Sequence, residues 1–280
     1  MSYLRPSFFI IGERKCGTSS LYRYLIAHPN VLPCQLKEPN FFGKGKPYVQ
    51  QNIDEYWAMF PQKNTAESIK FDWPELNERG ILYHEKVEIN RLTDVSYITG
   101  EASVNTFFEV NPTLVHQYLP DVQLILLFRN PVERAFSHHR MNQRFQEEGR
   151  SLGFRVHTFE EDIERELALF YAGEPTIYLS PGVYLNQLKK WRAVYPSSKF
   201  RIYFTETLKE SKGAITILKD LQQFLGLPHF DYQKEVEEQY NVAPRTEMST
   251  KIRQKLRGFY RKYNLALAAY LNIELPREWE

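Results

Sequence analysis

A glycine-framed loop stands between the pattern of a buried strand and the pattern of a helix, and this order leaves few folds open to the chain. The loop reads GERKCGTS over residues 12–19. Residues 7–11 before it form a short apolar run, typical of a parallel strand buried on both faces. Apolar residues after it recur at helical spacing until the His-Pro-Asn break at 28–30. Strand, loop and helix are half of a βαβ unit, in which backbone N–H groups converge on a bound anion.

The side chains of this loop distinguish between phosphate ligands. Its two glycines match the frame of the P-loop consensus G-x-x-x-x-G-K-S/T, but Thr18 occupies the position of the consensus lysine. In nucleotide triphosphatases that lysine reaches the β and γ phosphates, and the next hydroxyl holds Mg²⁺. Here Lys15 lies inside the loop, and Thr18 and Ser19 offer hydroxyl groups. This set predicts a site for a monophosphate-like group, with no metal required.

Two further strand patterns predict the fold class. Residues 122–128 form an apolar run followed by a helix, for which Asn130 suits the N-cap and Pro131 the first position. Residues 200–204 form another, followed by an amphipathic helix that ends before Gly226. Strands that alternate with helices indicate an α/β fold, with a P-loop-like parallel β-sheet flanked by helices.

The remaining segments fit one domain. We expect a single domain over residues 1–280, with insertions at about 43–90 and 149–181, where periodicity is weaker. A helix over about 183–195 precedes the last strand, and residues 249–280 indicate a basic helix, a break and a final apolar turn.

Composition excludes several classes of partner. Lys and Arg number 36 against 34 Asp and Glu, and the net charge of +2 is too small to predict a nucleic acid or acidic membrane partner. No run approaches the roughly 18 apolar residues of a membrane span. The two cysteines form no disulfide framework, which suits a reducing compartment, so we expect a cytoplasmic protein. Composition leaves the oligomeric state undetermined.

Arg129 and Ser137 form a second candidate anion site. Arg129 follows the run at 122–128, and Ser137 lies about two helical turns later. In open α/β sheets, ligands bind outside the carboxyl ends of the strands. A guanidinium and a hydroxyl there are suited to a second phosphate, one that ADP and ATP do not carry.

Together these motifs resemble those of the sulfotransferases that use 3′-phosphoadenosine 5′-phosphosulfate (PAPS), especially the glycan and heparan sulfate branch and its bacterial relatives. Residues 12–19 are similar to the family's 5′-phosphosulfate loop, and residues 129–137 to its 3′-phosphate motif. The resemblance implies in-line transfer of a sulfuryl group from PAPS to an acceptor hydroxyl or amine, with release of 3′,5′-ADP. The nucleotide ligands that it carries over are Lys15, Gly17, Thr18, Ser19, Arg129 and Ser137. Further candidate contacts to the nucleotide are Arg14, Cys16, Tyr184 and Arg245.

The resemblance also implies which groups carry the reaction. The segment KEPNFF at 37–42 is similar to the acidic segment that supplies the family's general base. We therefore expect Glu38 to take the acceptor proton and Lys15 to neutralise the leaving oxygen. Because Pro39 disfavours the α region for the residue before it, we expect Glu38 in an extended turn.

Several alternatives stay open. Glu101 is the second candidate base, followed by His138 and His139, which as neighbours on a helix are poorly placed to share a metal. Asn40 and Ala102 depart from the histidine and lysine of the glycan branch, so a small molecule, a lipid or a glycan could be the acceptor. A P-loop nucleotide kinase or triphosphatase, and a non-catalytic nucleotide-binding module, are the alternative functions.

Overall fold

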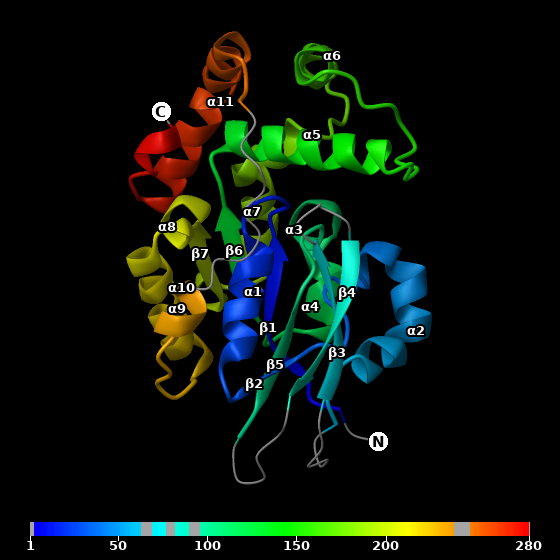
Figure 1. Ribbon diagram of the computed structural model, residues 1–280, viewed down its shortest axis with the longest axis vertical. Coiled ribbons are helices and arrows are strands. Elements are labelled where there is room, and N and C mark those ends of the chain that lie inside the picture. Colours follow the sequence, from blue (N-terminus) through cyan, green and yellow to red (C-terminus); the bar gives the residue numbers. More distant parts are fainter. Residues whose placement is uncertain (1–2, 63–68, 77–81, 90–95, 238–246, 280) are drawn as a thin grey trace.

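The computed structural model describes residues 3–62, 69–76, 82–89, 96–237 and 247–279. At its centre is a five-stranded sheet in the order β2-β5-β1-β6-β7, in which all pairings are parallel (Figure 1). These strands are Pro6–Gly12 (β1), Val31–Pro33 (β2), Ile98–Ala102 (β5), Gln123–Phe128 (β6) and Phe200–Phe204 (β7). The predicted α/β class, a parallel sheet flanked by helices, is confirmed.

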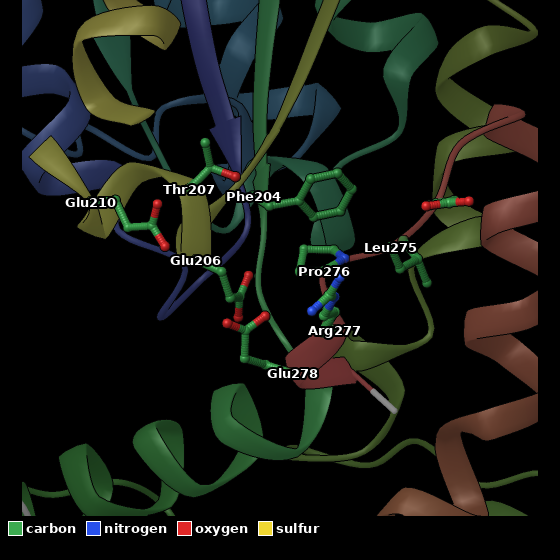
Figure 2. A pocket seen from close by; sticks show the side chains of 9 residues that line it. Phe204, Glu206, Thr207, Glu210, Leu275, Pro276, Arg277 and Glu278 are labelled. Carbon is green, nitrogen blue, oxygen red and sulfur yellow. The ribbon is translucent and has the colours of Figure 1, made fainter. Parts of the chain in front are cut away.

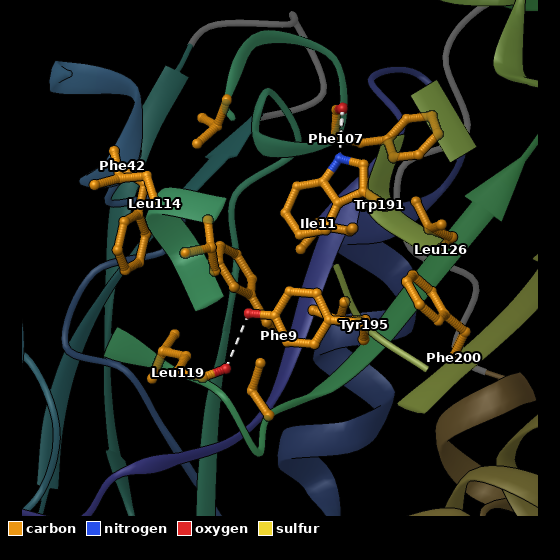
Figure 3. Packing of buried hydrophobic residues seen from close by; sticks show 14 of the residues in the cluster. Phe9, Ile11, Phe42, Phe107, Leu114, Leu119, Leu126, Trp191, Tyr195 and Phe200 are labelled. Carbon is orange, nitrogen blue, oxygen red and sulfur yellow. Dashed lines mark hydrogen bonds between the residues drawn. The ribbon is translucent and has the colours of Figure 1, made fainter. Parts of the chain in front are cut away.

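Alternate residues of β1 pack into two different cores, because successive side chains of a strand point to opposite faces. Phe9 and Ile11 belong to a cluster that includes Trp191, whose indole N–H donates to the Phe107 carbonyl oxygen at 2.9 Å (Figure 3). Phe8 and Ile10 join the other cluster, on the side of the helices Thr18–Ala27 (α1) and Ser211–Leu225 (α9). Burial on both faces explains why β1 is apolar without alternation.

Two predicted helix ends are confirmed in detail. Helix α5 spans Pro131–Glu147, and the Asn130 side chain accepts a hydrogen bond from the Val132 N–H at 2.9 Å. Helix α9 ends at Gly226, whose φ of 68° is the left-handed conformation that glycine tolerates best. Figure 1 shows α5 lying beyond the carboxyl ends of the central strands, where it faces the loop after β1.

The two segments predicted as insertions carry elements of their own. Between β2 and β5 lie helix Lys46–Ala58 (α2) and the antiparallel strands Ile69–Leu76 (β3) and Leu82–Ile89 (β4). The second segment, after α5, carries helix Phe159–Tyr171 (α6). It begins with a capping box, in which Thr158 and Glu161 exchange hydrogen bonds between side chains and backbone.

The other elements complete the layers around the sheet. Helix Thr250–Leu271 (α11) forms the basic tail helix and ends at Asn272, and a 3-10 turn, Arg277–Trp279, follows it. No helix within the described residues is long and apolar enough to cross a membrane. The remaining helices are Thr106–Glu109 (α3), Pro112–Tyr118 (α4), Tyr184–Arg192 (α7), Thr205–Lys209 (α8) and Gln233–Glu237 (α10), with 3-10 turns at Phe42–Lys44, Ser180–Gly182 and Ser197–Lys199.

Candidate active site

The loop after β1 is fixed to β6 and to the first residue of α8, which follows β7. The Glu13 N–H donates to the Leu127 carbonyl oxygen at 3.0 Å, which joins the loop to β6. The buried Thr205 hydroxyl lies 2.6 Å from the Cys16 carbonyl oxygen and 3.1 Å from that of Phe128. Gly17, with φ of 86°, makes the left-handed turn into α1. The loop is therefore held in place before any ligand arrives.

Lys15 places a half-buried side chain with an ammonium group at this loop. Its φ of 68° is left-handed, and no described residue accepts a hydrogen bond from its side chain. Burial lowers the pKa of Lys15 to about 8, helped by the charges of Arg144, Arg129 and Arg14 and opposed by Glu38. Because these cations surround Lys15, an anion that binds here would relieve their mutual repulsion.

Arg129 lies directly beside Lys15. Its Nη1 donates to the Lys15 carbonyl oxygen at 3.1 Å, while its Nε is buried without a partner among the described residues. Its backbone is fixed on both sides: the Tyr184 hydroxyl donates to the Arg129 carbonyl oxygen at 2.7 Å, and the Asn130 N–H donates to Glu206 Oε1 at 2.9 Å. The two predicted anion sites thus meet at one edge of the sheet.

Three other predicted ligands lie on the helices that follow Gly17 and Arg129. Thr18 and Ser19 are the first two residues of α1, where backbone N–H groups have no partner within the helix. Thr18 is buried and Ser19 half-buried. Ser137 is half-buried on α5, after Arg129. Their placement on these helices is consistent with the predicted hydroxyl and N–H donors.

Three more predicted ligands are placed differently, and Arg245 lies outside the described residues. Burial raises the pKa of the Cys16 thiol to about 12, so Cys16 is a neutral core residue. Tyr184 is only 2% exposed, and its ring stacks on that of Phe128 with 4.3 Å between the ring centroids. Its hydroxyl supports the Arg129 backbone rather than facing a ligand. Arg14 is already engaged, because its Nε donates to Asn105 at 3.0 Å and its Nη2 pairs with Glu109 at 3.2 Å.

Glu38 lies in a turn near Lys15, but not in the predicted extended conformation. Its φ is 59° and that of Asn40 is 46°, both left-handed. The expectation was wrong because tertiary contacts hold this turn: the Asn40 N–H donates to Ser103 Oγ at 3.0 Å, and its side-chain amide donates to the Glu38 carbonyl oxygen at 3.0 Å. The Glu38 carboxylate is about one-third exposed and pairs with the buried Lys37 ammonium.

Glu101, the alternative base, is sealed inside the protein. It has no exposed surface, and burial raises its pKa to about 7. Both carboxylate oxygens are engaged: the Tyr56 hydroxyl donates to Oε1 at 2.6 Å and the Ser103 hydroxyl to Oε2 at 2.5 Å. An acceptor substrate could not reach this carboxylate without opening the core.

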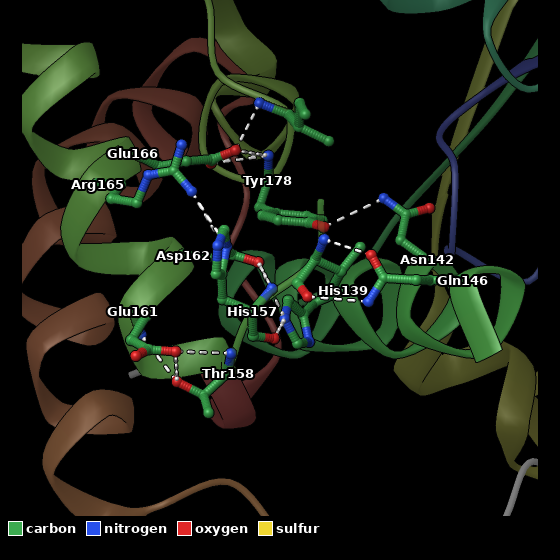
Figure 4. Close-up of polar contacts among 12 residues, drawn as sticks. His139, Asn142, Gln146, His157, Thr158, Glu161, Asp162, Arg165, Glu166 and Tyr178 are labelled. Carbon is green, nitrogen blue, oxygen red and sulfur yellow. Dashed lines mark hydrogen bonds and ion pairs between the residues drawn. The ribbon is translucent and has the colours of Figure 1, made fainter. Parts of the chain in front are cut away.

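The two histidines of α5 have separate structural partners. Nε2 of His138 lies 3.2 Å from Arg14 Nη1, and burial holds its pKa well below the usual range, so it is neutral and accepts this bond. His139 contacts Asp162 of α6 at 3.3 Å, and Asp162 also binds His157 at 3.0 Å (Figure 4). No cluster of three or more His, Cys, Asp or Glu side chains in the described ranges is arranged to hold a metal ion.

The prediction missed two charged residues near the loop. Arg144, seven residues after Ser137 and so on the same helix face, is the nearby charge that most lowers the pKa of Lys15. This spacing was readable in the sequence. Glu13 is 2% exposed, and burial raises its pKa to about 7, opposed by the fully buried Arg134. The burial of Glu13 has no local sequence signal.

A pocket of about 370 Å³ lies beside this edge, at the carboxyl end of β7 (Figure 2). Glu206 links it to the Arg129 turn through the Asn130 N–H. Four glutamates against one arginine make it unfavourable for phosphate. Its lining residues are Phe204, Glu206, Thr207, Glu210, Glu274, Leu275, Pro276, Arg277 and Glu278.

A match to a protein-family model identifies the family to which this chain belongs. The model of the sulfotransferase family matches residues 6–231, which include the loop, the Glu38 turn and the Arg129 segment. The chain belongs to the sulfotransferase family. A crystal structure of a sulfotransferase from Alicyclobacillus acidocaldarius is 25% identical, covers 97% of each chain and superposes with a TM-score of 0.62. The resemblance predicted from the motifs is confirmed.

Curated relatives of this sulfotransferase family member are larger proteins. Human carbohydrate sulfotransferase 15 is 25% identical over 316 residues, covering 96% of this chain and 54% of the relative. Human bifunctional heparan sulfate N-deacetylase/N-sulfotransferase 3 is 26% identical over 236 residues, covering 82% of this chain and 23% of the relative. The chain thus spans about half the length of the first relative and a quarter of the second.

Proposed function

We propose that this protein transfers a sulfuryl group from PAPS to an acceptor hydroxyl or amine. The observation that carries the proposal is the contact between the two anion sites: Arg129 Nη1 lies 3.1 Å from the Lys15 carbonyl oxygen, and Arg129 Nε has no partner among the described residues. A doubly phosphorylated nucleotide suits two adjacent cations at one sheet edge. Family membership supports the same reading.

Different residues are suited to the two ends of the donor. The Lys15 ammonium and the N–H groups that begin α1 suit the 5′ side, where negative charge develops on the leaving oxygen. Arg129, with its unpartnered Nε, and Ser137 suit the 3′-phosphate. PAPS supplies the sulfuryl group and is released as 3′,5′-ADP. Catalysis then depends on positioning and charge stabilisation.

Glu38 is the proposed general base. Its charge raises the pKa of Lys15, so the carboxylate lies near the ammonium that would face the reacting group. It is partly exposed, as an acceptor substrate requires, whereas Glu101 is sealed. A base must come within hydrogen-bond reach of the proton it abstracts, and of the two carboxylates only Glu38 has exposed surface for an acceptor to approach.

The test is transfer of label from ³⁵S-labelled PAPS to a panel of acceptors, with Glu38→Gln as the variant. We expect turnover to fall by about 10²-fold or more while the affinity for 3′,5′-ADP stays unchanged. Glu174→Gln, at an exposed glutamate after α6, is the matched control and should keep full turnover. Near-normal turnover in the Glu38 variant would reject the base assignment.

The acceptor and the cellular location are further proposals. The names of the relatives, a carbohydrate sulfotransferase and a heparan sulfate N-sulfotransferase, favour a glycan over a lipid or another small molecule. Cys16 and Cys34 are both buried free thiols, which favours the cytoplasm. Stabilisation by Mg-ATP but not by 3′,5′-ADP would instead support the kinase or triphosphatase.

A further inference from the structure

A buried hydrogen-bond relay runs from α2 through β5 to the turn that carries Glu38. At its centre is Glu101, which has no exposed surface. The Tyr56 hydroxyl of α2 donates to Oε1 at 2.6 Å, and the Ser103 hydroxyl donates to Oε2 at 2.5 Å. A carboxylate that accepts two hydroxyl donors is fully satisfied only when it is ionised, because the protonated acid must donate one bond itself.

Ser103 connects this carboxylate to the Glu38 turn. Its Oγ accepts the Asn40 N–H at 3.0 Å while its own hydroxyl hydrogen is directed to Glu101. The Asn40 side chain donates in turn to the Glu38 carbonyl oxygen at 3.0 Å. The Ser103 N–H donates to the Ile10 carbonyl oxygen at 3.1 Å, which anchors the relay to β1. One rigid strand end therefore supports the left-handed turn.

We propose that Glu101 is a positioning residue, whose ionised carboxylate orients Ser103 and thereby holds the Glu38 turn in its working conformation. The inference rests on the proposed function for its catalytic consequence, but the relay itself is a property of the fold. Orientation of this kind matters because small displacements of a reacting group lower the rate steeply. Glu101 touches no substrate in this role.

Protonation of Glu101 should weaken the relay. Burial raises its pKa to about 7, the hydrogen bonds from Ser103 and Tyr56 oppose the rise, and the Glu38 charge adds to it. Tyr22 and Cys34 also lie within electrostatic reach of Glu101, but burial raises the pKa of both groups, so they remain neutral near pH 7. Above pH 7 the carboxylate accepts both hydroxyls. Below it, one of the two bonds must reverse or break, and Ser103 loses its fixed orientation.

The experiment measures amide hydrogen exchange in residues 37–42 together with turnover, from pH 6 to 8.5. In the wild type, we expect the Asn40 amide to lose its protection from exchange below about pH 7, after the exchange rates are corrected for their intrinsic pH dependence. Glu101→Gln and Ser103→Ala should both lose protection throughout this range. Their turnover should fall about tenfold while the affinity for 3′,5′-ADP is kept, because the phosphate loop is untouched.

A control and a double variant decide between positioning and direct catalysis. Thr99→Val removes another buried β5 hydroxyl, which donates to the Leu32 carbonyl oxygen at 2.7 Å, and should leave Asn40 protected. Glu101→Gln combined with Ser103→Ala should lose no more turnover than either change alone, since both act through one path. Wild-type protection in Ser103→Ala would overturn the relay. A turnover loss confined to Glu101→Gln would make Glu101 the base instead. Absence of any sulfuryl transfer by the wild type would reject the proposed function, while the exchange data would still test the relay.

Discussion

Lys15 should take up a proton when the nucleotide binds. Its pKa of about 8 leaves this ammonium about half protonated at pH 8. A phosphate beside it favours the charged form and raises that pKa. If the bound-state pKa rises by about 2 units, binding of 3′,5′-ADP takes up about 0.5 proton at pH 8 and about 0.1 at pH 7. Affinity should be nearly independent of pH below 8 and should fall by up to about tenfold per unit above it.

Isothermal titration calorimetry in two buffers of different ionisation enthalpy measures this uptake directly. Glu13 and Glu101, with pKa values of about 7, are mostly ionised at pH 8, but a bound anion could raise their pKa values too. Lys15→Met isolates the lysine contribution, because the carboxylates remain. We expect most of the uptake at pH 8 to vanish in this variant. Equal uptake by the variant and the wild type would show that Lys15 does not face the phosphate.

Two stability predictions separate the loop from the periphery. Thr205→Val removes the hydroxyl beside the Cys16 and Phe128 carbonyl oxygens, and it should lower the free energy of unfolding by about 1–3 kcal/mol. The same change should weaken 3′,5′-ADP binding. Unchanged affinity would contradict the role of Thr205 in holding the loop. Thr158→Ala removes the capping box of α6, and it should lower the free energy of unfolding measured in urea by about 1 kcal/mol while the nucleotide affinity stays unchanged. A loss of affinity would show that α6 is coupled to the site.

The features that sequence predicted well are those with short-range causes. The β1 run, the helix end at Gly226 and the Asn130 cap each depend on a few adjacent residues, and the structure has all three. Parallel topology then brings Lys15 and Arg129 to one edge, because the carboxyl ends of parallel strands lie together. The two anion motifs can therefore be related from the sequence alone.

The features that sequence did not predict depend on distant contacts. Glu101 is buried because Tyr56, 45 residues away, covers it, and no local pattern encodes that meeting. Strand β2 has only three residues and ends in proline, too short for periodicity to reveal. The left-handed conformation of Glu38 likewise follows from the bond between Asn40 and Ser103, which overrides the preference of a residue before proline.

The most direct test of the account compares the affinities of 3′,5′-ADP and 5′-AMP, without Mg²⁺, for the wild type and for Arg129→Ala. Because 3′,5′-ADP gains one charge-assisted contact to its 3′-phosphate, the wild type should bind it about 10- to 100-fold more tightly than 5′-AMP. The ratio should fall toward one in the variant. Equal wild-type affinity for the two nucleotides would contradict the claim that Lys15 and Arg129 hold opposite ends of a single doubly phosphorylated ligand.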